Sequence, residues 1–248
     1  MKILLFLLAA LACLPAHAAS SPWFETDGAK MRLLARPVVG GLEAALQVEL
    51  EPGFKTYWKV PGASGVPPMI TLGGDAFSDS IASVQTKIRW PAPQVYRDGS
   101  GLVTGYTNAV TFPIDITGSV DALPQLVARG LIGVCGEICI PVQFSLTVPL
   151  NRQAGSSVEE ARVFAAAHAS TTPSKTVSLQ ARGKFLTASA TSAAGQIYWV
   201  SSTEGTAPIL GTISGSSVTF DVLAKAGETG LLISDGKAAR AEVIPATD

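Results

Sequence analysis

The sequence is poor in histidine, which excludes several kinds of catalytic site. It contains two histidines among 248 residues, and His17 lies in an amino-terminal segment that we expect to be removed. Nucleophilic hydrolysis and zinc catalysis usually depend on histidine, and no serine or cysteine nucleophile motif accompanies His168. We therefore expect His168 to be a surface or packing residue on a helix. Two thiols and one distant imidazole also cannot supply the four ligands of a structural zinc site, so no metal site is expected.

An excess of charge of either sign is also missing. The net charge is −1 at pH 7, and lysines and arginines are scattered without runs, so neither nucleic acid nor an anionic membrane surface is an expected partner. The glycines Gly99, Gly101 and Gly105 miss the dinucleotide-binding spacing by one residue and do not lie between a strand and a helix. We expect a flexible loop there and no cofactor.

Long hydrophobic runs are absent except at the amino terminus. Lys2 precedes an apolar run at Ile3–Ala12, and an A-x-A site ends at Ala18, which predicts a signal peptide at residues 1–18. The run is shorter than the roughly 18 residues of a spanning helix. We expect a soluble mature protein exported to the periplasm, with no membrane span. The residues before Cys13 form a poor lipobox, which leaves a lipid anchor as an alternative.

The remaining composition is typical of a turn-rich β protein, with abundant glycine, serine, threonine, valine and proline. Leu42, Ala44, Leu46, Val48 and Leu50 alternate with other residues, as in a strand with one face on a core. Five to seven runs of this kind favour an antiparallel, immunoglobulin-like sandwich. The clearest runs in the first half are Lys30–Arg36, Gly41–Leu50, Ser83–Trp90, Val110–Thr117 and Val142–Leu150.

A helix divides this half from a second group of strands. Ser157 and Glu160 form a capping box ahead of a helix at Val158–Ala169. We expect an all-β protein with a signal peptide at 1–18, a sandwich domain at 19–150, a linker with the helix at 151–174, and a second, smaller β domain at 175–248. The predicted strands of that domain are Val177–Ala190, Ile197–Ser202, Val218–Val222 and Leu231–Ser234.

After removal of the signal peptide, two cysteines remain, Cys135 and Cys139. In an extended strand their Cα atoms would lie about 13 Å apart, at roughly 3.3 Å per residue, whereas a disulfide requires roughly 4.4 to 6.8 Å. The chain must therefore turn between them if they are bonded. Gly136 permits the unusual φ values of a tight turn, and Pro141 argues against a helix through the site.

The cysteine pair can be interpreted in three ways. An ordinary stabilising disulfide is common in exported proteins, but a ring this small contributes only about 2 kcal/mol, which favours a redox role. A two-coordinate Cu(I) thiolate site is a further option. No basic residue is adjacent in sequence, and Glu137 disfavours a thiolate, so we expect the pair to receive attack from a partner's activated thiol.

Three stretches together resemble the amino-terminal thiol:disulfide interchange domain of the DsbD family, and especially its ScsB branch. The resemblance covers about Trp23 to Leu150. The three stretches in this order are more specific than any one stretch alone. The stretches are TYWKVPGASGVPP at 56–68, RWPAP at 89–93 and CGEICIP at 135–141.

The resemblance implies an immunoglobulin-like periplasmic domain in which Cys135 and Cys139 are the redox pair. It also implies a cap loop at about Gln94 to Gly105 that shields them. Asp98 falls near an acidic position of that loop. The aromatic cap residue of the DsbD branch corresponds to Gly99, with Tyr96 as a candidate replacement.

Aromatic residues of the other two stretches have two interpretations. Tyr57, Trp58 and Trp90 could border the redox site, or they could pack in the core, which is the commoner role of buried aromatic side chains. Glu137 lies between the cysteines and completes the predicted site.

The resemblance further implies that electrons arrive from a thioredoxin-like partner and pass to the disulfides of client proteins. Full-length members carry a transmembrane relay and a thioredoxin-like domain that this sequence does not show. We therefore expect separate partners: a periplasmic thioredoxin-like protein and a membrane thiol transporter of the DsbD, ScsB or CcdA type. The pathway could serve cytochrome c biogenesis, copper tolerance or disulfide repair. The alternative is a noncatalytic β-sandwich adaptor or copper-binding module with a structural disulfide.

Overall fold

The structure is a computed structural model that describes most of the chain beyond the predicted signal peptide. The predicted peptide itself and the polar segment 151–156 lie outside the described residues. Among the described residues, no helix is long and apolar enough to cross a membrane. The described ranges are 19–62, 64–74, 84–99, 101–150, 157–171, 176–189, 196–203, 206–234 and 237–245.

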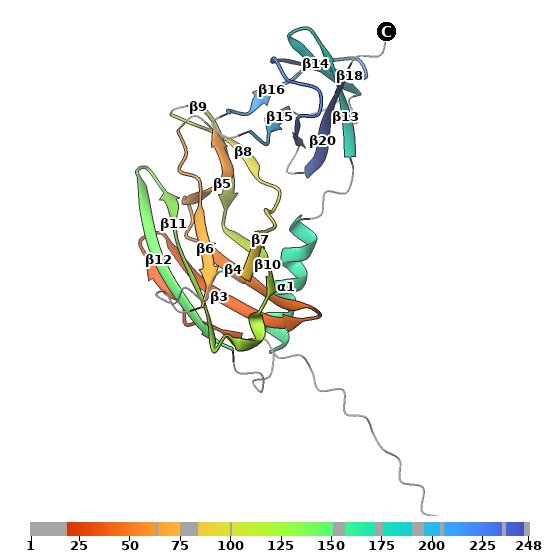
Figure 1. Cartoon of the computed structure of the whole chain (residues 1–248). Helices are drawn as coiled ribbons and strands as arrows, with labels where there is room; N and C mark the ends of the chain where they lie inside the picture. The colour runs from red at the N-terminus through yellow and green to blue at the C-terminus, as the bar shows by residue number, and fades with distance from the viewer. Residues whose placement is uncertain are drawn as a thin grey trace, which may run out of the picture.

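The first β unit is a sandwich of two six-stranded sheets (Figure 1). In sheet A the strand order is β1-β3-β4-β10-β7, and β2 also pairs with β3. All of these pairings are antiparallel. The strands of sheet A are β1 (Ala19–Ser20), β2 (Phe24–Thr26), β3 (Ala29–Val38), β4 (Gly41–Leu50), β7 (Val84–Ile88) and β10 (Ala109–Gly118).

Sheet B contains the strands that carry the predicted redox site. Its order is β12-β11-β5-β9-β8, and β6 also pairs with β11. A short 3-10 helix, η2 (Val120–Ala122), leads from sheet A into β11. The strands of sheet B are β5 (Lys55–Gly62), β6 (Met69–Gly73), β8 (Gln94–Asp98), β9 (Gly101–Thr107), β11 (Gln125–Cys135) and β12 (Cys139–Pro149).

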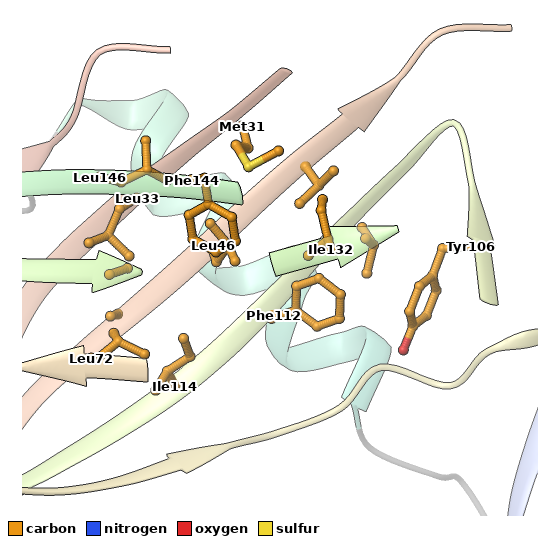
Figure 2. Close-up of a cluster of buried hydrophobic side chains, with 14 of the residues drawn as sticks. Met31, Leu33, Leu46, Leu72, Tyr106, Phe112, Ile114, Ile132, Phe144 and Leu146 are labelled. Carbon is orange, nitrogen blue, oxygen red and sulfur yellow. The ribbon is translucent and has the colours of Figure 1, made fainter. Parts of the chain in front are cut away.

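The core of the sandwich is formed by the inner faces of both sheets (Figure 2). The alternating residues of β4 from Leu42 to Leu50 all belong to this core, as the sequence pattern predicts. Phe112 lies among aromatic side chains, with the rings of Trp90 and Tyr106 packed edge-on against it at 5.3 and 5.6 Å. The immunoglobulin-like sandwich predicted for this half of the chain is confirmed.

Helix α1 (Val158–Thr171) begins with the predicted capping box. The backbone N–H of Glu160 donates to the Ser157 hydroxyl at 3.1 Å. In return, the Glu160 carboxylate accepts from the N–H of Ser157 at 2.9 Å. These bonds satisfy N–H groups that the first helical turn leaves without intrahelical partners. The helix ends two residues later than predicted, at Thr171 instead of Ala169.

The helix covers the outer face of sheet A. Phe164 is fully buried and packs against Leu34 and Ala45. The sequence pattern of β4 predicts one buried face, but the helix also buries part of the second, including Ala45 and Glu43. The small side chain of Ala45 permits the close approach of the helix on this second face.

The second β unit is one eight-stranded sheet, sheet C, with the order β16-β15-β19-β20-β13-β14-β18-β17. Its ends approach each other, since β16 also contacts β18, so the sheet is nearly a closed barrel. Its own core includes Trp199 and Phe220. The strands are β13 (Thr176–Arg182), β14 (Phe185–Ser189), β15 (Ile197–Ser201), β16 (Ile209–Leu210), β17 (Thr212–Ser214), β18 (Ser217–Asp221), β19 (Thr229–Ser234) and β20 (Lys237–Pro245).

One strand prediction in this unit is wrong. The run Val177–Ala190 is not one strand but a hairpin of β13 and β14, which pair antiparallel. The chain reverses at Gly183, whose φ of +58° lies in the left-handed region that glycine adopts without steric cost. Lys184 follows in the turn.

The two β units are in contact. Val200 of β15 and Ile233 of β19 belong to the same buried cluster as the sandwich core, and Tyr198 and Leu231 pack against it. Figure 1 shows sheet C beyond one end of the sandwich, past the end of α1.

Candidate functional site

The predicted cysteine pair lies at the tip of the β11–β12 hairpin. Cys135 and Cys139 are the last paired residues of the two strands, and they form a disulfide with a Cα–Cα distance of 4.0 Å. The N–H of Gly136 donates to the carbonyl of Ile138 at 3.2 Å and closes the turn. The turn that the spacing requires is therefore present.

The reason for glycine at position 136 differs from our expectation. Gly136 does not adopt a left-handed φ, unlike other glycines of the chain. A Cβ at this position would instead lie 3.1 Å from the ring of Phe54, so it is the close approach of this ring that leaves little room for a side chain. Glu137, next in the turn, is exposed to solvent.

The two cysteines differ sharply in exposure. Cys135 is fully buried, together with Tyr57 and Val103, whereas Cys139 is exposed. Its neighbours are exposed apolar residues: Ile138 is 77% exposed and Ile140 is 42% exposed. Because a nucleophile must approach the sulfur it attacks, Cys139 is the accessible end of the bond.

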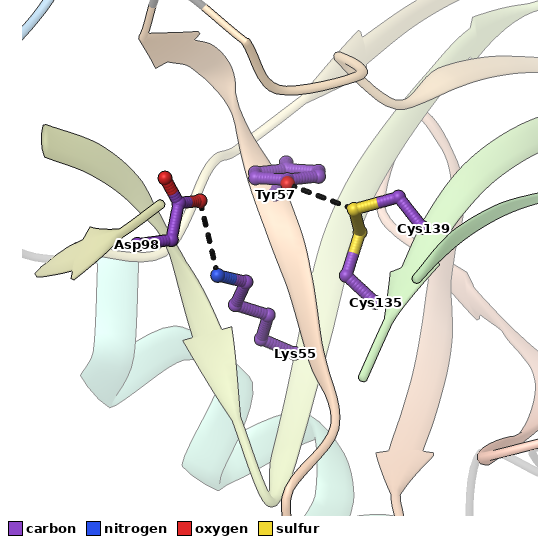
Figure 3. Close-up of a disulfide and its surroundings, with 5 residues drawn as sticks. All are labelled: Lys55, Tyr57, Asp98, Cys135 and Cys139. Carbon is purple, nitrogen blue, oxygen red and sulfur yellow. Dashed lines mark hydrogen bonds and ion pairs between the residues drawn. A yellow bond between two sulfur atoms is a disulfide. The ribbon is translucent and has the colours of Figure 1, made fainter. Parts of the chain in front are cut away.

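Tyr57 from β5 contacts the disulfide directly (Figure 3). Its hydroxyl lies 3.2 Å from Sγ of Cys139, and because a disulfide sulfur carries no proton, the hydroxyl is the donor. Burial raises the pKa of Tyr57 above its ordinary value, and the negative charge of Asp98 raises it further. The hydroxyl therefore stays protonated at neutral pH and available as a donor.

Glycines determine the position of the Tyr57 ring. A Cβ at Gly65 would lie 2.8 Å from Cδ1 of the ring, and a Cβ at Gly133 would lie 3.1 Å from Cδ2 on the opposite edge. Gly62 has a φ of +97° at the end of β5, so the chain can turn back and bring Gly65 and Val66 against the site. The positive φ of Gly62 and the close approach of Gly65 to the ring explain the two glycines of the segment that follows Trp58.

The predicted cap loop at Gln94 to Gly105 is a β-hairpin and not an irregular loop. Strands β8 and β9 pair from Gln94 opposite Gly105 to Asp98 opposite Gly101. Tyr96 is half-buried and packs against the cluster that contains Cys135, while its hydroxyl donates to the Gln94 side chain at 2.7 Å. Gly99 lies exposed in the turn. Tyr96 is thus the aromatic residue of this hairpin that contacts the cluster of Cys135.

A lysine beside the disulfide was missed by the sequence reasoning. Lys55 is paired with Cys135 across β5 and β11, and its ammonium binds Asp98 at 3.1 Å. Figure 3 shows the Lys55 side chain reaching toward Asp98, and the Tyr57 hydroxyl pointing at Cys139. No basic residue is adjacent to the cysteines in the sequence, but the pairing of β5 with β11 places Lys55 beside Cys135 in the fold. The only sequence signal was that Lys55 directly precedes the TYW segment.

The other aromatic candidates do not contact the disulfide. Trp58 alternates with Tyr57 on β5 and points into the sandwich core, and Trp90 packs on Phe112. Both therefore have a packing role, the commoner of the two interpretations.

His168 is part of a charged cluster and not an isolated surface residue. Its Nε2 lies 2.5 Å from the carboxylate of buried Glu43, and Arg89 donates to its Nδ1 at 2.9 Å. Arg89 and Arg36 also bind Glu43, at 2.7 and 2.6 Å. This network ties α1 to sheet A, which is a structural role.

The disulfide and its surroundings can perform thiol exchange. Within the described ranges, no three His, Cys, Asp or Glu side chains come together as a metal site would require. What the site provides is one accessible sulfur, one buried sulfur, a hydroxyl donor and an ion pair.

Comparison with known proteins agrees with this chemistry. Residues 30–150 match the family described as "Thiol:disulfide interchange protein DsbD, N-terminal". The fold is similar to the crystal structure of the N-terminal periplasmic domain of ScsB from Proteus mirabilis, at 26% identity and a TM-score of 0.68, covering 90% of this chain and 97% of that one.

Other matches are weaker. The periplasmic chaperone SfaE shares 9% identity at a TM-score of 0.21, covering 82% of this chain and 92% of that one. Tandem Ig repeats of Dlar share 11% identity at a TM-score of 0.21, covering 84% and 91%. No curated protein matches the chain in sequence. Residues 30–150 are therefore an N-terminal domain of the DsbD/ScsB family of thiol:disulfide interchange proteins.

Proposed function

We propose that this protein is a periplasmic dithiol–disulfide oxidoreductase that passes electrons from a thioredoxin-like donor to the disulfides of client proteins. The observation that carries the proposal is the unequal exposure of the disulfide: Cys139 is exposed and Cys135 is fully buried. A bond with a single accessible sulfur is attacked at one defined atom, which is the geometry that a relay requires.

The exchange proceeds in two thiol–disulfide steps. The donor thiolate attacks Sγ of Cys139, the Cys135–Cys139 bond breaks, and Cys135 leaves as a thiolate that takes up a proton. The donor's second thiol then attacks the donor sulfur that is bonded to Cys139, which forms a disulfide within the donor and releases Cys139. The donor dithiol is oxidised by two electrons, and the cysteine pair gains two electrons and two protons. The same steps in reverse reduce a client disulfide.

Neighbouring side chains stabilise each sulfur when it leaves as a thiolate. The Tyr57 hydroxyl donates to Cys139, so it stabilises negative charge when that sulfur is released. Lys55 lies on the same face as Cys135 and supplies positive charge beside the buried thiolate.

An apolar rim around the exposed sulfur favours a protein donor. Ile138 and Ile140 flank Cys139 and are exposed, and apolar residues of this kind are typical of docking surfaces. The partners proposed are a thioredoxin-like periplasmic protein and a membrane thiol transporter of the DsbD, ScsB or CcdA type.

Trapping of a mixed disulfide tests the proposal. Cys135→Ala, activated at Cys139 as a thionitrobenzoate adduct, should form a stable mixed disulfide with a thioredoxin-like protein that retains only its attacking cysteine. Cys139→Ser, treated identically, should form little because its remaining sulfur is buried.

The reduction potential of the wild-type pair gives a second readout. It should lie above about −300 mV, the region below which structural disulfides fall. A potential below that value together with no mixed disulfide would identify a structural bridge in a noncatalytic adaptor.

A further inference from the structure

A groove of about 580 Å³ lies between the sandwich and sheet C. Residues from β5 and β7 form one side, and residues from β19 and β20 form the other. Its volume falls within the roughly 300 to 1,000 Å³ of pockets that hold small organic ligands. The groove does not include the cysteines: its lining residue Trp58 points away from the face of β5 that carries Tyr57.

The charged side chains of the groove are all positive. Lys59, Lys87, Arg89 and Arg240 line it, and no aspartate or glutamate does. Arg89 is bound by Glu43 at 2.7 Å and by Asp115 at 3.2 Å. For Lys59, Lys87 and Arg240, by contrast, the described part of the chain provides no ion-pair partner within 4.0 Å. Three cations thus face one groove without a direct ion pair to any described residue, although Asp115, which binds Arg89, lies opposite Lys87 on β10.

Buried donors without acceptors belong to two of the same lining residues. Nε1 of Trp58 and Nε of Arg89 are buried, and neither has a hydrogen-bond partner among the described residues. Trp58 itself is only 3% exposed. Buried polar groups in native proteins are nearly always hydrogen-bonded, and an acceptor oxygen of a bound ligand is one way to satisfy such donors.

Lys59 is also placed in an environment that favours an anion. Its ammonium lies 5.2 Å from the centre of the Trp58 ring, and burial lowers the pKa of Lys59. An anion bound nearby would favour the charged form of the lysine and offset this loss of hydration.

We propose that this groove binds a small organic anion, with its carboxylate or phosphate group among Lys59, Lys87 and Arg240 and its apolar part against Trp58 and Leu231. Charge-assisted hydrogen bonds from lysine and arginine are the usual means of holding such oxygens. Leu231 and Trp90 supply apolar lining, which inorganic anions do not need. The site is separate from the disulfide and does not depend on the redox function.

Calorimetric titration with four probes tests the site: phenyl phosphate, phenylacetate, inorganic phosphate and benzyl alcohol. Phenyl phosphate or phenylacetate should bind saturably and roughly tenfold more tightly than benzyl alcohol, which lacks the charge, and more tightly than inorganic phosphate, which lacks the ring. The comparison of phenyl phosphate with phenylacetate distinguishes the two kinds of acidic group. Binding should persist in the protein with both cysteines replaced, so failure here is distinguishable from failure of the redox proposal.

Two exposed lysines provide matched variants. Lys87→Met should weaken binding roughly tenfold, and Lys87→Met with Arg240→Met should weaken it further. Lys225→Met, an exposed lysine outside the groove, should leave binding unchanged. In nitrogen-15 NMR spectra the indole N–H signal of Trp58 should shift on titration, and that of Trp23 should not.

Three results would overturn the proposal. They are absence of saturable binding for both organic anions, binding that Lys87→Met with Arg240→Met leaves unchanged, and binding of inorganic phosphate as tight as that of phenyl phosphate.

Discussion

Lys55 and Cys135 lie directly opposite each other on β5 and β11. Side chains at opposed positions of antiparallel strands share one face of the sheet, with Cβ atoms about 4.5 to 5.5 Å apart. In the oxidised protein the Lys55 ammonium binds Asp98 at 3.1 Å. When Cys135 is released as a thiolate, a positive charge is already present on its face of the sheet.

The first prediction concerns this lysine. In the Cys139→Ser background, Lys55→Met should raise the pKa of the Cys135 thiol by about one unit, because removal of a neighbouring cation disfavours the thiolate. Titration of the thiolate by ultraviolet absorbance measures the change. Lys55→Arg should restore the lower pKa, and Lys30→Met, at an exposed ion pair with Glu49, should have no effect. Equal pKa values with and without the Lys55 charge would refute this role.

The second prediction concerns the apolar rim. Ile138→Ser should slow reduction by a thioredoxin-like protein about five- to tenfold, since exposed apolar residues at the centre of an interface carry much of its binding energy. Reduction by dithiothreitol should not change, because a small thiol needs no docking surface. Leu223→Ser is the matched control, with a leucine that is 79% exposed and lies between β18 and β19 of the second β unit. If both variants behave alike in stopped-flow measurements, the rim does not dock the donor.

The third prediction concerns Tyr96 as a shield of the redox cluster. Tyr96→Ala should accelerate reduction by glutathione threefold or more, on the order expected when access to a sulfur improves, and should change reduction by the protein donor little. Tyr198→Ala is a suitable control because Tyr198 also donates to a glutamine two residues earlier, Gln196, at 2.5 Å. An unchanged glutathione rate would mean that the hairpin does not gate the disulfide.

The fourth prediction separates the function of the cysteine pair from stability. Cys135→Ala with Cys139→Ser should lower the free energy of unfolding by about 2 kcal/mol, the loop-entropy contribution of so short a ring. Alanine is chosen at position 135 because a buried serine would leave a hydroxyl without a partner. Urea denaturation should give a cooperative transition for this variant and for the reduced wild-type protein. A variant that is unfolded without denaturant would establish a structural bridge instead.

The fifth prediction concerns alkaline pH. Burial raises the pKa of Tyr106 well above its ordinary value of 10.0, and burial also raises those of Tyr57 and Tyr96. The unfolded chain therefore ionises first, so stability is fully present below about pH 10 and falls as the pH rises toward the raised values.

Urea denaturation at neutral and alkaline pH measures this loss. Tyr106→Phe should lower the free energy of unfolding at neutral pH by about 1 kcal/mol, because it removes the hydrogen bond to the carbonyl of Pro91 at 2.8 Å. In this variant, however, the free energy of unfolding should decrease less steeply as the pH rises above about 10. Tyr198→Phe, at an exposed hydrogen bond, should leave the decline as steep as in the wild-type protein.

Local sequence patterns predicted the fold class and the individual elements that carry a strong local signal. The alternation along Gly41–Leu50 predicted β4 because the inward face of a strand repeats every second residue. The capping box at Ser157 predicted the start of α1 because the two side chains satisfy adjacent N–H groups. Both signals lie within a few residues, so no knowledge of tertiary contacts was needed.

The missed features depend on contacts between distant segments. Lys55 reaches Cys135 only through the pairing of β5 with β11, and Glu43 meets His168 only through the packing of α1 on sheet A. The turn at Gly183 was missed for a different reason, since a single glycine in a strand-like run also fits a bulge or a close approach. The cysteine pair itself could be predicted because Cys135 and Cys139 are the two cysteines that remain after removal of the predicted signal peptide.

The contact of Tyr57 with Gly65 and Gly133 has a consequence for which substitutions the site tolerates. With the tyrosine ring in place, a methyl group at either glycine would overlap or crowd it, and a displaced ring would carry its hydroxyl away from Cys139. Positions 57 and 133 are therefore coupled, because a larger residue at 133 requires a smaller one at 57, and that exchange removes the hydroxyl from the sulfur. Position 65 is restricted further, since a Cβ there would also lie 2.3 Å from Cβ of Pro61. Mutational scanning of position 133 in tyrosine and alanine backgrounds at position 57 should reveal this dependence as opposite preferences.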